Sequence, residues 1–574
     1  MKKNTKVMVA AVVVLIAALA IWFAVGQPPA EEPVAEDPVE DPVAEDPVAE
    51  DPAEEVPVQR TYTLFYGMTG RDPVQLSETR IGQLVSEKTG VTLEIEFVVG
   101  GDAATRAGTM IASGDFPDII FGHGEHNRFI EAGALVPIQD MIADKPNIQR
   151  TYGDILDMHR HPDTGNIYFL TPYRGAPDLA HIGIGFWLVK DLVRDLGFPV
   201  VTDIDEYFNI IRDYVARNPE FNGAPTIGFT FPAEGWRFFE LTNPPNFLMG
   251  YPNDGDVQIS RGDSPEDFVA RTYATSDSAR EYLRRLNQLW NEGLLDREVF
   301  VQTHDQWIEK VSSGRVVGMT AQRWQFAGSP MQALEDQDLG WRRFFPFQLL
   351  NEGVERGQYV GASVPTIRDG MSISIAAEDP EGIIQFFEDF MSDEVQKLIH
   401  WGVEGEDYNV GSDGLFYRTQ EQRDKRADPE YVRTQGTDWW AFPSTISPFA
   451  DGNQIPGLTI SEVKAEYDEI ELEMLEGFGV DTFAQLAPEP IPSPYGFAWD
   501  IALPDGSPAQ LANTRIGDLR RFHYPRMVMA ANQAEFDAEW NAFVAAFEET
   551  GYADYEAFMT QAIQERVRNW GLLD

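Results

Sequence analysis

The stretch of sequence that decides the fold runs from Leu84 to Ile119. An amphipathic segment ends there at EKTG (Glu87–Gly90) and leads into VTLEIEF (Val91–Phe97), which alternates apolar and polar residues as a strand does. A second helical segment precedes ASGDFPDIIF (Ala112–Phe121), whose apolar end predicts another strand. The order helix, strand, helix, strand predicts the beginning of an α/β lobe.

Loops at the ends of the predicted strands supply candidate polar contacts. TYTLFYG (Thr61–Gly67) alternates as a strand and precedes the turn-rich segment 68–73, and the strand Ile119–Phe121 precedes Gly122–Glu125. Open α/β sheets meet ligands at the carboxyl ends of their strands. We therefore predict ligand contacts in these loops, with ion pairs at the surface or between lobes as the alternative. The candidates are Thr69, Arg71, His123 and Glu125.

Further elements follow along the chain. The pattern predicts a helix that ends at Gly197, a helix whose start is marked by Thr202 and Glu206, and a helix over Ser278–Trp290. SGRVVGM (Ser313–Met319) is typical of a strand, and Pro380–His400 is predicted to be one helix.

Composition excludes several classes of protein. The chain has 574 residues, 43% of them hydrophobic, and its 93 acidic against 44 basic residues give a net charge of −49. Nucleic acid is not an expected partner, because phosphate binding needs a basic surface. The acidity indicates a hydrated surface suited to salty surroundings or, alternatively, a face that attracts a cationic ligand. The chain has no Cys, which excludes disulfides, thiolate metal sites and cysteine nucleophiles.

The N-terminus predicts export. Positive residues within 1–6 precede an apolar run over 7–25, so 1–26 is either a cleaved signal peptide or a retained membrane anchor. Residues 27–60 are acidic and rich in Pro, which predicts an extended, disordered tether. In polyproline II geometry, at about 3.1 Å per residue, its reach approaches roughly 100 Å.

No enzyme signature stands out. Pairs of carboxylates are too common in so acidic a chain to indicate a glycosidase. Gly183 and Gly185 lack the third glycine of a dinucleotide site. His123 with His126, and His159 with His161, lack a third ligand at a sensible spacing, so no metal site and no cofactor are predicted.

Several segments after Arg60, taken in order, carry a resemblance to a known family. The segments are SEKTGVTLEIE (Ser86–Glu96), IASGDFPDII (Ile111–Ile120), EAGALVPI (Glu131–Ile138), VKDLVRDLGFPVVTDIDEYF (Val189–Phe208), WNEGLLD (Trp290–Asp296), SGRVVGM (Ser313–Met319), WGVEGEDY (Trp401–Tyr408) and EWNAFVAAFEETGYADYEAFMTQAIQE (Glu539–Glu565). They resemble the family 1 extracellular solute-binding proteins of sugar ABC importers, and the last resembles the long-form oligosaccharide binders.

The resemblance implies a fold and a function. The expected fold is α/β and periplasmic-binding-protein-like, with two hinged lobes and a ligand cleft. Residues 61–175 with 355–405 are assigned to the N-terminal lobe, and 176–354 with 406–574 to the C-terminal lobe and its extension. The expected function is capture of an oligosaccharide at the extracellular face of the membrane, and its delivery to ABC permease subunits without catalysis. The protein is expected to be a monomer, anchored or secreted.

Two alternatives remain beside this reading. One is a cell-surface carbohydrate-active enzyme or adhesion module, and the other is a peptide or osmolyte binder of the same fold. Oligosaccharide binding without product formation would distinguish the importer subunit from the enzyme.

Aromatic residues are the leading ligand candidates, because sugars present apolar C–H faces ringed by hydroxyls. Trp324 matches a place where the family commonly stacks a sugar ring, and Gln322 and Arg323 beside it could contact hydroxyls or an acidic sugar. Packing, within a lobe or between lobes, is the alternative for each aromatic residue, and it is favoured for Trp401, Trp439 and Trp440. The other aromatic candidates are Trp236, Tyr359 and Trp401.

One segment departs from the family. Some long-form members carry a calcium loop after the helix that here ends near Arg217. In this chain Asn218–Pro225 offers too few alternating oxygen ligands for a hard cation, so calcium is not expected there.

Overall fold

The computed structural model describes residues 59–68, 74–98, 103–172, 177–359, 364–436, 439 and 441–573, which fall within a single unit. Among these residues no helix is both long and apolar enough to cross a membrane. The predicted leader and tether, 1–26 and 27–60, lie outside the described residues except for their last two positions, and so do the candidates Thr69 and Arg71.

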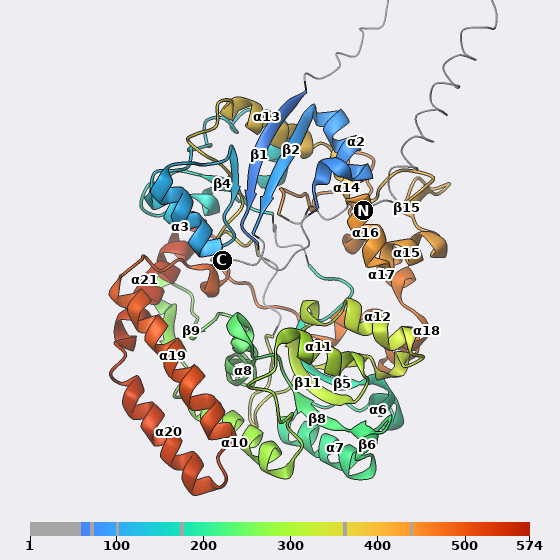
Figure 1. Cartoon of the computed structure of the whole chain (residues 1–574), viewed down its shortest axis with the longest axis vertical. Coiled ribbons are helices and arrows are strands. Elements are labelled where there is room, and N and C mark those ends of the chain that lie inside the picture. Colours follow the sequence, from blue (N-terminus) through green and yellow to red (C-terminus); the bar gives the residue numbers. More distant parts are fainter. Residues whose placement is uncertain are drawn as a thin grey trace, which may run out of the picture. The chain divides into compact units, whose positions relative to one another are not determined.

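The first sheet contains the strands of the segment Leu84–Ile119 that decides the fold (blue strands in Figure 1). The three strands that come first in the chain are parallel, as the helix–strand alternation predicted, and the strand that returns from later in the chain is antiparallel to both of its neighbours. In spatial order the strands are β2 (Val91–Phe97), β1 (Arg60–Tyr66), β3 (Ile119–Phe121), β13 (Met371–Ile373) and β4 (Phe169–Leu170).

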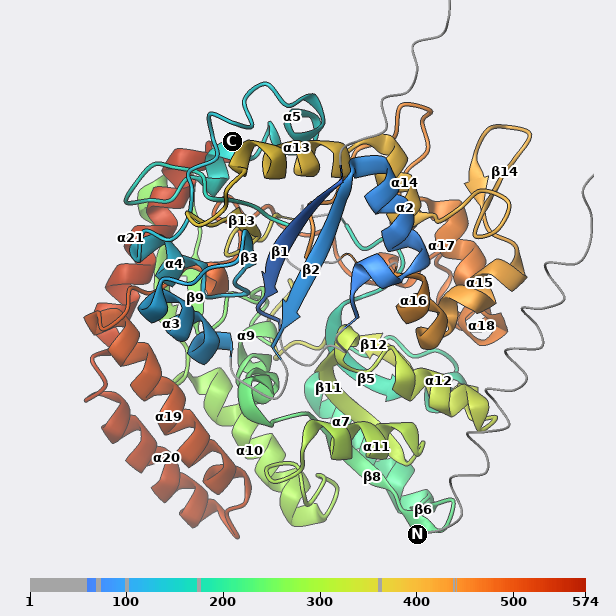
Figure 2. The ribbon, with the colours of Figure 1, turned by 45° about the horizontal axis from the view of Figure 1, so that its top comes forward.

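Side chains of β1 enter two different clusters, because successive residues of a strand point to opposite faces. Leu64 and Tyr66 belong to one buried cluster, and Phe65 to another that also holds Ala107 and Met110. Both faces of the sheet are therefore covered. The helices around it, some of them visible beside β1 and β2 in Figure 2, are α2 (Arg80–Thr89), α3 (Ala103–Ser113), α4 (His126–Glu131), α5 (Pro146–Tyr152), α13 (Pro380–Phe390) and α14 (Asp393–His400).

Two local patterns explain the helix ends in this region. Helix α2 ends where predicted, because Gly90 adopts the left-handed conformation with φ 68° that favours glycine. The single helix predicted over Pro380–His400 is wrong. The structure ends α13 at Phe390 and begins α14 at Asp393, since the side chain of Ser392 accepts a hydrogen bond from the backbone N–H of Val395 and so caps a new helix.

The second sheet is mixed. Strand β5 is antiparallel to β11 and β12, and β11 is parallel to β8. In spatial order the strands are β12 (Phe344–Phe347), β5 (Ile184–Val189), β11 (Val316–Gln322) and β8 (Ile227–Thr230). The helices between and beside them are α6 (Lys190–Asp195), α7 (Ile204–Arg217), α8 (Phe239–Thr242), α9 (Pro244–Phe247), α10 (Asp277–Glu292), α11 (His304–Ser312) and α12 (Ser329–Asp336).

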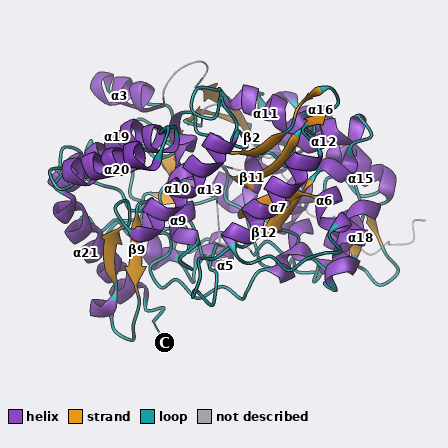
Figure 3. Cartoon of the chain, turned by 90° about the horizontal axis from the view of Figure 1, so that it is seen from below, coloured by secondary structure: helices purple, strands orange, loops and turns teal. Residues whose placement is uncertain are grey.

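The last three helices of the chain pack against one another and against a hairpin from earlier in the chain. Helices α19, α20 and α21 lie together, and α21 contacts the hairpin of β9 and β10 (Figure 3). Their bounds are β9 (Val257–Ser260), β10 (Val269–Thr272), α19 (Pro508–Val528), α20 (Gln533–Phe547) and α21 (Tyr552–Trp570). The remaining strands and α-helices are β6 (Glu220–Phe221), β7 (Ala224–Pro225), β14 (Asn409–Val410), β15 (Phe416–Tyr417), α15 (Gln420–Ala427), α16 (Pro429–Gln435), α17 (Ile460–Glu466) and α18 (Glu469–Phe478).

One short segment does not follow the lobe boundaries drawn from the sequence. Trp439 and Phe442 were assigned to the second lobe, but they pack in the core of the first sheet, where the Trp439 ring lies 5.2 Å from that of Phe390. Their apolar side chains pack against Phe390 of α13. The chain therefore passes between the two cores at least three times, between Leu170 and Ile184, between Phe347 and Met371, and between Phe442 and Val463.

Candidate functional site

A cavity of about 920 Å³ is bordered by residues of both sheets and of the C-terminal region. Its volume lies in the range of roughly 300–1,000 Å³ that is usual for small-molecule sites. The first sheet contributes residues that follow or precede its strands, and the second contributes the ends of β5 and β11. Residues that border it include His123, Thr171, Asp178, His181, Ile184, Asn253, Gln322, Trp324, Arg368, Asp369, Thr482, Gln485, Phe497 and Trp499.

Trp324 presents an exposed ring to this cavity. Its side chain is 57% exposed although it follows the buried strand β11. One face is covered by Trp236, whose ring lies parallel to it at 5.6 Å, and Trp236 in turn stacks on Phe239 at 5.9 Å. The Trp324 indole N–H donates to Oε1 of Gln322 over 2.6 Å. The ring is thus fixed from behind and along its edge, as a stacking platform requires.

A buried acid holds the loop that carries Trp324. Oε1 of Glu240 on α8 accepts hydrogen bonds from the backbone N–H of Gln322, at 2.8 Å, and from the side chain of Gln325. Burial raises the pKa of the Glu240 carboxyl to about 8, so the group is mostly protonated at pH 7. The residues before and after the platform are therefore tied to one neutral, fully buried side chain.

A second aromatic platform comes from a part of the chain that sequence reasoning missed. Trp499 borders the same cavity, is 38% exposed and stacks on Phe497 at 5.1 Å. Its loop is fixed by Asp254, which accepts from the Tyr495 hydroxyl at 2.9 Å and from the backbone N–H of Ala498 at 3.2 Å. The only signal in the sequence is an aromatic pair after a run of prolines, which neither helix nor strand periodicity could place.

The wall on the side of the first sheet is polar. His123, in the loop after β3, borders the cavity and has a φ of 45°, which is uncommon for a residue other than glycine. Its Nδ1 lies 3.9 Å from Oδ2 of Asp369, which precedes β13. Arg368 borders the cavity beside them, with Nε 3.7 Å from Asp369. The structure therefore brings His123 together with the platform candidates, as the position at a strand end predicted.

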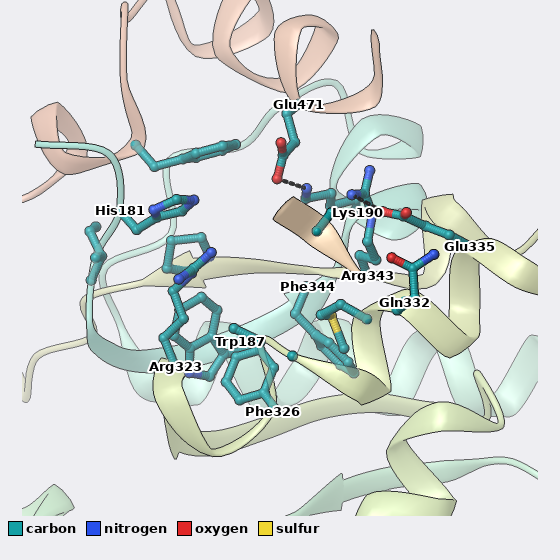
Figure 4. A pocket seen from close by; sticks show the side chains of 17 residues that line it. His181, Trp187, Lys190, Arg323, Phe326, Gln332, Glu335, Arg343, Phe344 and Glu471 are labelled. Carbon is teal, nitrogen blue, oxygen red and sulfur yellow. Dashed lines mark hydrogen bonds and ion pairs between the residues drawn. The ribbon is translucent and has the colours of Figure 1, made fainter. Parts of the chain in front are cut away.

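A smaller cavity of about 310 Å³ adjoins the first, because His181 and Ile182 border both (Figure 4). Arg323 borders this smaller cavity rather than the larger one. Its neighbours on the loop, Gln322 and Trp324, border the larger one. The loop after β11 thus faces two cavities at once.

The other predicted residues do not join the cavity as open contacts. Tyr359 borders it but is fully buried, and its hydroxyl donates to the carbonyl of Leu349 at 2.5 Å. Glu125 does not border it, and its carboxylate accepts from Arg128 at 2.7 Å.

Trp401 is placed elsewhere. It is 1% exposed in a separate cluster with Tyr408, Phe416 and Phe449, and its indole N–H donates to the carbonyl of Gln454. Its ring packs inside the protein, which corrects the assignment of Trp401 as a ligand contact. Trp236 does not border the cavity either, and supports Trp324 from behind.

The described residues offer no ready metal site. In that part of the chain, no group of three or more His, Asp or Glu side chains is placed to hold an ion. The segment after α7, where calcium was considered, forms a short hairpin of β6 and β7 with Asn222 at its turn.

These features together can bind a guest without covalent chemistry. Two exposed aromatic rings that border one cavity, together with amide, hydroxyl and charged groups that also border it, match a molecule with flat apolar faces and polar edges. The cavity is bordered from both sheets, so movement of one sheet's body relative to the other would change its width.

The sequence model of one protein family, the bacterial extracellular solute-binding proteins, matches residues 80–397. The chain belongs to this family. As a solute-binding protein it has the predicted α/β fold, which is confirmed by solved structures of similar architecture. The alginate-binding protein AlgQ2 without calcium ion matches with a TM-score of 0.60, 17% identity and coverage of 89% of this chain and 98% of that one. FusA of S. pneumoniae in complex with kestose matches with a TM-score of 0.63, 16% identity and coverage of 89% and 100%.

Two curated relatives of this solute-binding protein are similar in sequence. The fructooligosaccharide ABC transporter substrate-binding protein FusA of Streptococcus pneumoniae serotype 4 is 24% identical over 261 residues, 42% of this chain and 46% of FusA. The polygalacturonan/rhamnogalacturonan-binding protein YtcQ of Bacillus subtilis strain 168 is 21% identical over 347 residues, 59% of this chain and 65% of YtcQ. Each alignment spans less than two thirds of the relative.

Proposed function

We propose that this solute-binding protein captures an oligosaccharide outside the cell and delivers it to the permease subunits of an ABC importer. The observation that carries the proposal is the pair of tryptophans, Trp324 and Trp499, that border one cavity from distant parts of the chain. Both rings are exposed and both are held by a stacked aromatic neighbour. Such platforms bind the C–H faces of sugar rings while the polar groups between them meet hydroxyls.

The relatives support the same class of ligand. FusA is named for fructooligosaccharides and an ABC transporter, and YtcQ for polygalacturonan and rhamnogalacturonan. These ligands differ in charge, but all of them are chains of sugar residues. We therefore assign the class of ligand, and with it a binding rather than a catalytic role, to the cleft of this protein.

The organisation of the chain fits delivery from outside the membrane. We propose that 1–26 is a leader or anchor, that 27–60 is a tether, and that the lobes are 61–175 with 355–405 and 176–354 with 406–574. Residues 439–442 move to the first lobe because Trp439 and Phe442 pack in its core. Mass spectrometry of the mature N-terminus distinguishes a cleaved leader from a retained anchor.

Calorimetry with a panel of oligosaccharides, run beside a hydrolysis assay, tests the proposal. Binding of one saccharide per protein molecule without any product supports an importer subunit. Release of shorter saccharides would indicate an enzyme instead. If peptides or small osmolytes bind and no saccharide does, the ligand belongs to one of those classes and is not an oligosaccharide.

A further inference from the structure

The smaller cavity concentrates positive side chains in a very acidic chain. Figure 4 shows Arg323 on one side of it, and Lys190 and Arg343 on the other. Two carboxylates, Glu335 and Glu471, also border it. At physiological ionic strength charges more than about 8 Å apart are largely screened. The local set of charges, rather than the net charge of the chain, therefore decides what the cavity attracts.

Most of these charges already have partners. Arg343 forms ion pairs with Glu335 and with Asp468. Lys190 is buried and lies 3.3 Å from Glu471 (dashed line in Figure 4). Within the described part of the chain, these ion pairs compensate the positive charges of Lys190 and Arg343.

Arg323 differs from the other two cations. Among the described residues none forms a hydrogen bond or an ion pair with its guanidinium, and the charges around it act only through longer-range attraction. The strongest attraction from a negative charge comes from Asp178, whose Oδ1 accepts the backbone N–H groups of Ala180 and His181, each at 2.9 Å. Because the two side chains form no hydrogen bond with each other, Asp178 attracts Arg323 only from a distance.

A largely buried guanidinium without a partner is costly. Burial lowers the pKa of Arg323, which reflects the loss of water around the charge. Burial and the neighbouring Arg323 also lower the pKa of His181, so its ring is neutral and adds no charge to the cavity. That ring stacks on Phe483 at 6.2 Å and forms a flat wall beside Arg323. An anionic group placed here would supply the missing partner.

We propose that the ligand is an acidic oligosaccharide, one anionic substituent of which enters the smaller cavity and pairs with Arg323. This inference rests on the proposed function. Arg323 and Trp324 are consecutive, so one loop supplies both the stacking ring in the larger cavity and the charge in the smaller one. A carboxylate of a uronic acid and a sulfate ester both match the planar fork of a guanidinium.

Calorimetry with three oligosaccharides of equal length tests the inference, one neutral, one carrying uronic acids and one carrying sulfate esters. The unaltered protein is expected to bind an acidic ligand more tightly than the neutral one, and the two acidic ligands distinguish carboxylate from sulfate. Arg323→Gln should weaken binding of the preferred acidic ligand by roughly 10- to 100-fold, because a charged hydrogen-bonding partner is lost. In this variant the ratio of the affinity for the acidic ligand to the affinity for the neutral ligand should fall toward one.

Two further variants keep the result interpretable. Arg323→Lys retains the charge but not the fork, and should restore part of the preference. Arg212→Gln removes a positive charge from a surface ion pair with Glu292, away from both cavities, and should leave every affinity unchanged. Thermal unfolding of each variant confirms that it is folded.

The outcomes separate the two proposals. If neutral saccharides bind at least as tightly as acidic ones, or if Arg323→Gln keeps the preference of the unaltered protein, the acidic ligand is refuted while saccharide capture stands. If no saccharide of any charge binds, the proposed function fails and this inference fails with it.

Discussion

At the scale of single residues, the two exposed tryptophans carry the most direct prediction. Trp324→Ala and Trp499→Ala should each weaken saccharide binding by about 1–3 kcal/mol, since each removes one stacking face. Calorimetry against the best saccharide measures the loss. The control is Phe522→Ala, which should leave the affinity unchanged. The Phe522 ring lies on α19, is 51% exposed and borders neither cavity. Unchanged binding in Trp499→Ala would remove that residue from the site.

The buried acid under the Trp324 loop predicts a dependence of stability on pH. Burial raises the pKa of Glu240 from the ordinary 4.5 to about 8, so the folded protein keeps a proton that the unfolded chain loses. This stabilisation is complete below pH 4.5 and is lost as the pH rises through about 8. Between these limits the loss is on the order of a few kcal/mol.

Glu240→Gln isolates that contribution. The amide keeps an oxygen that can accept from the backbone of Gln322 but carries no titrating proton. The Tm of the variant should therefore match that of the unaltered protein near pH 5 and exceed it near pH 9. Glu355→Gln, at an exposed position, should reproduce the unaltered profile. Equal pH profiles for Glu240→Gln and the unaltered protein would show that the carboxyl does not titrate as its burial requires.

At the scale of elements, the start of α7 shows how the sequence pattern can be off by one residue. Thr202 and Glu206 marked the start of a helix, and the helix is present, but its first turn is capped by Asp203. The Asp203 carboxylate accepts from the backbone N–H of Asp205 at 2.8 Å and of Glu206 at 2.9 Å. Both Thr and Asp are common caps, so composition alone did not choose between neighbours.

Substitution of these neighbours gives a matched test. Asp203→Ala should destabilise the first turn of α7 by about 1 kcal/mol, because two backbone N–H groups lose their acceptor. Amide hydrogen exchange at Asp205 and Glu206 should accelerate accordingly. Thr202→Ala should leave this exchange unchanged, since the Thr202 side chain caps nothing in the described hydrogen bonds. Faster exchange in Thr202→Ala alone would show that Thr202, and not Asp203, caps the helix.

The sequence predicted elements well where a pattern repeats and a residue ends it. Val91–Phe97 is a strand with the predicted bounds, because it alternates and follows the left-handed Gly90. The position of Trp324 after β11 followed from the family resemblance. Trp499 could not be predicted, because its loop has no period and is fixed by Asp254, which is distant in sequence. The sequence allowed for packing of Trp401 but could not name its partners, because Phe449 and Gln454 follow much later in the chain.

At the scale of the whole molecule, the connections between the two sheets predict a change of shape on binding. The chain crosses between the two cores at least three times, and the larger cavity is bordered by both sheets. A ligand that contacts both walls binds more tightly when they approach, so it shifts the protein toward a closed state. Because the chain has no Cys, spin labels attach only to cysteines that are introduced.

A label pair that spans the two sheets tests closure directly. With labels at Glu87→Cys on α2 and Asp213→Cys on α7, both exposed, the distance distribution should shorten and narrow when a saccharide saturates the protein. A pair within the first lobe, Glu87→Cys with Asp163→Cys, should give the same distribution with and without ligand. Calorimetry on the labelled protein confirms that the ligand is bound under the same conditions. If the spanning pair stays unchanged while binding is complete, the two sheets behave as one rigid body, and delivery to a permease would have to be signalled by something other than lobe closure.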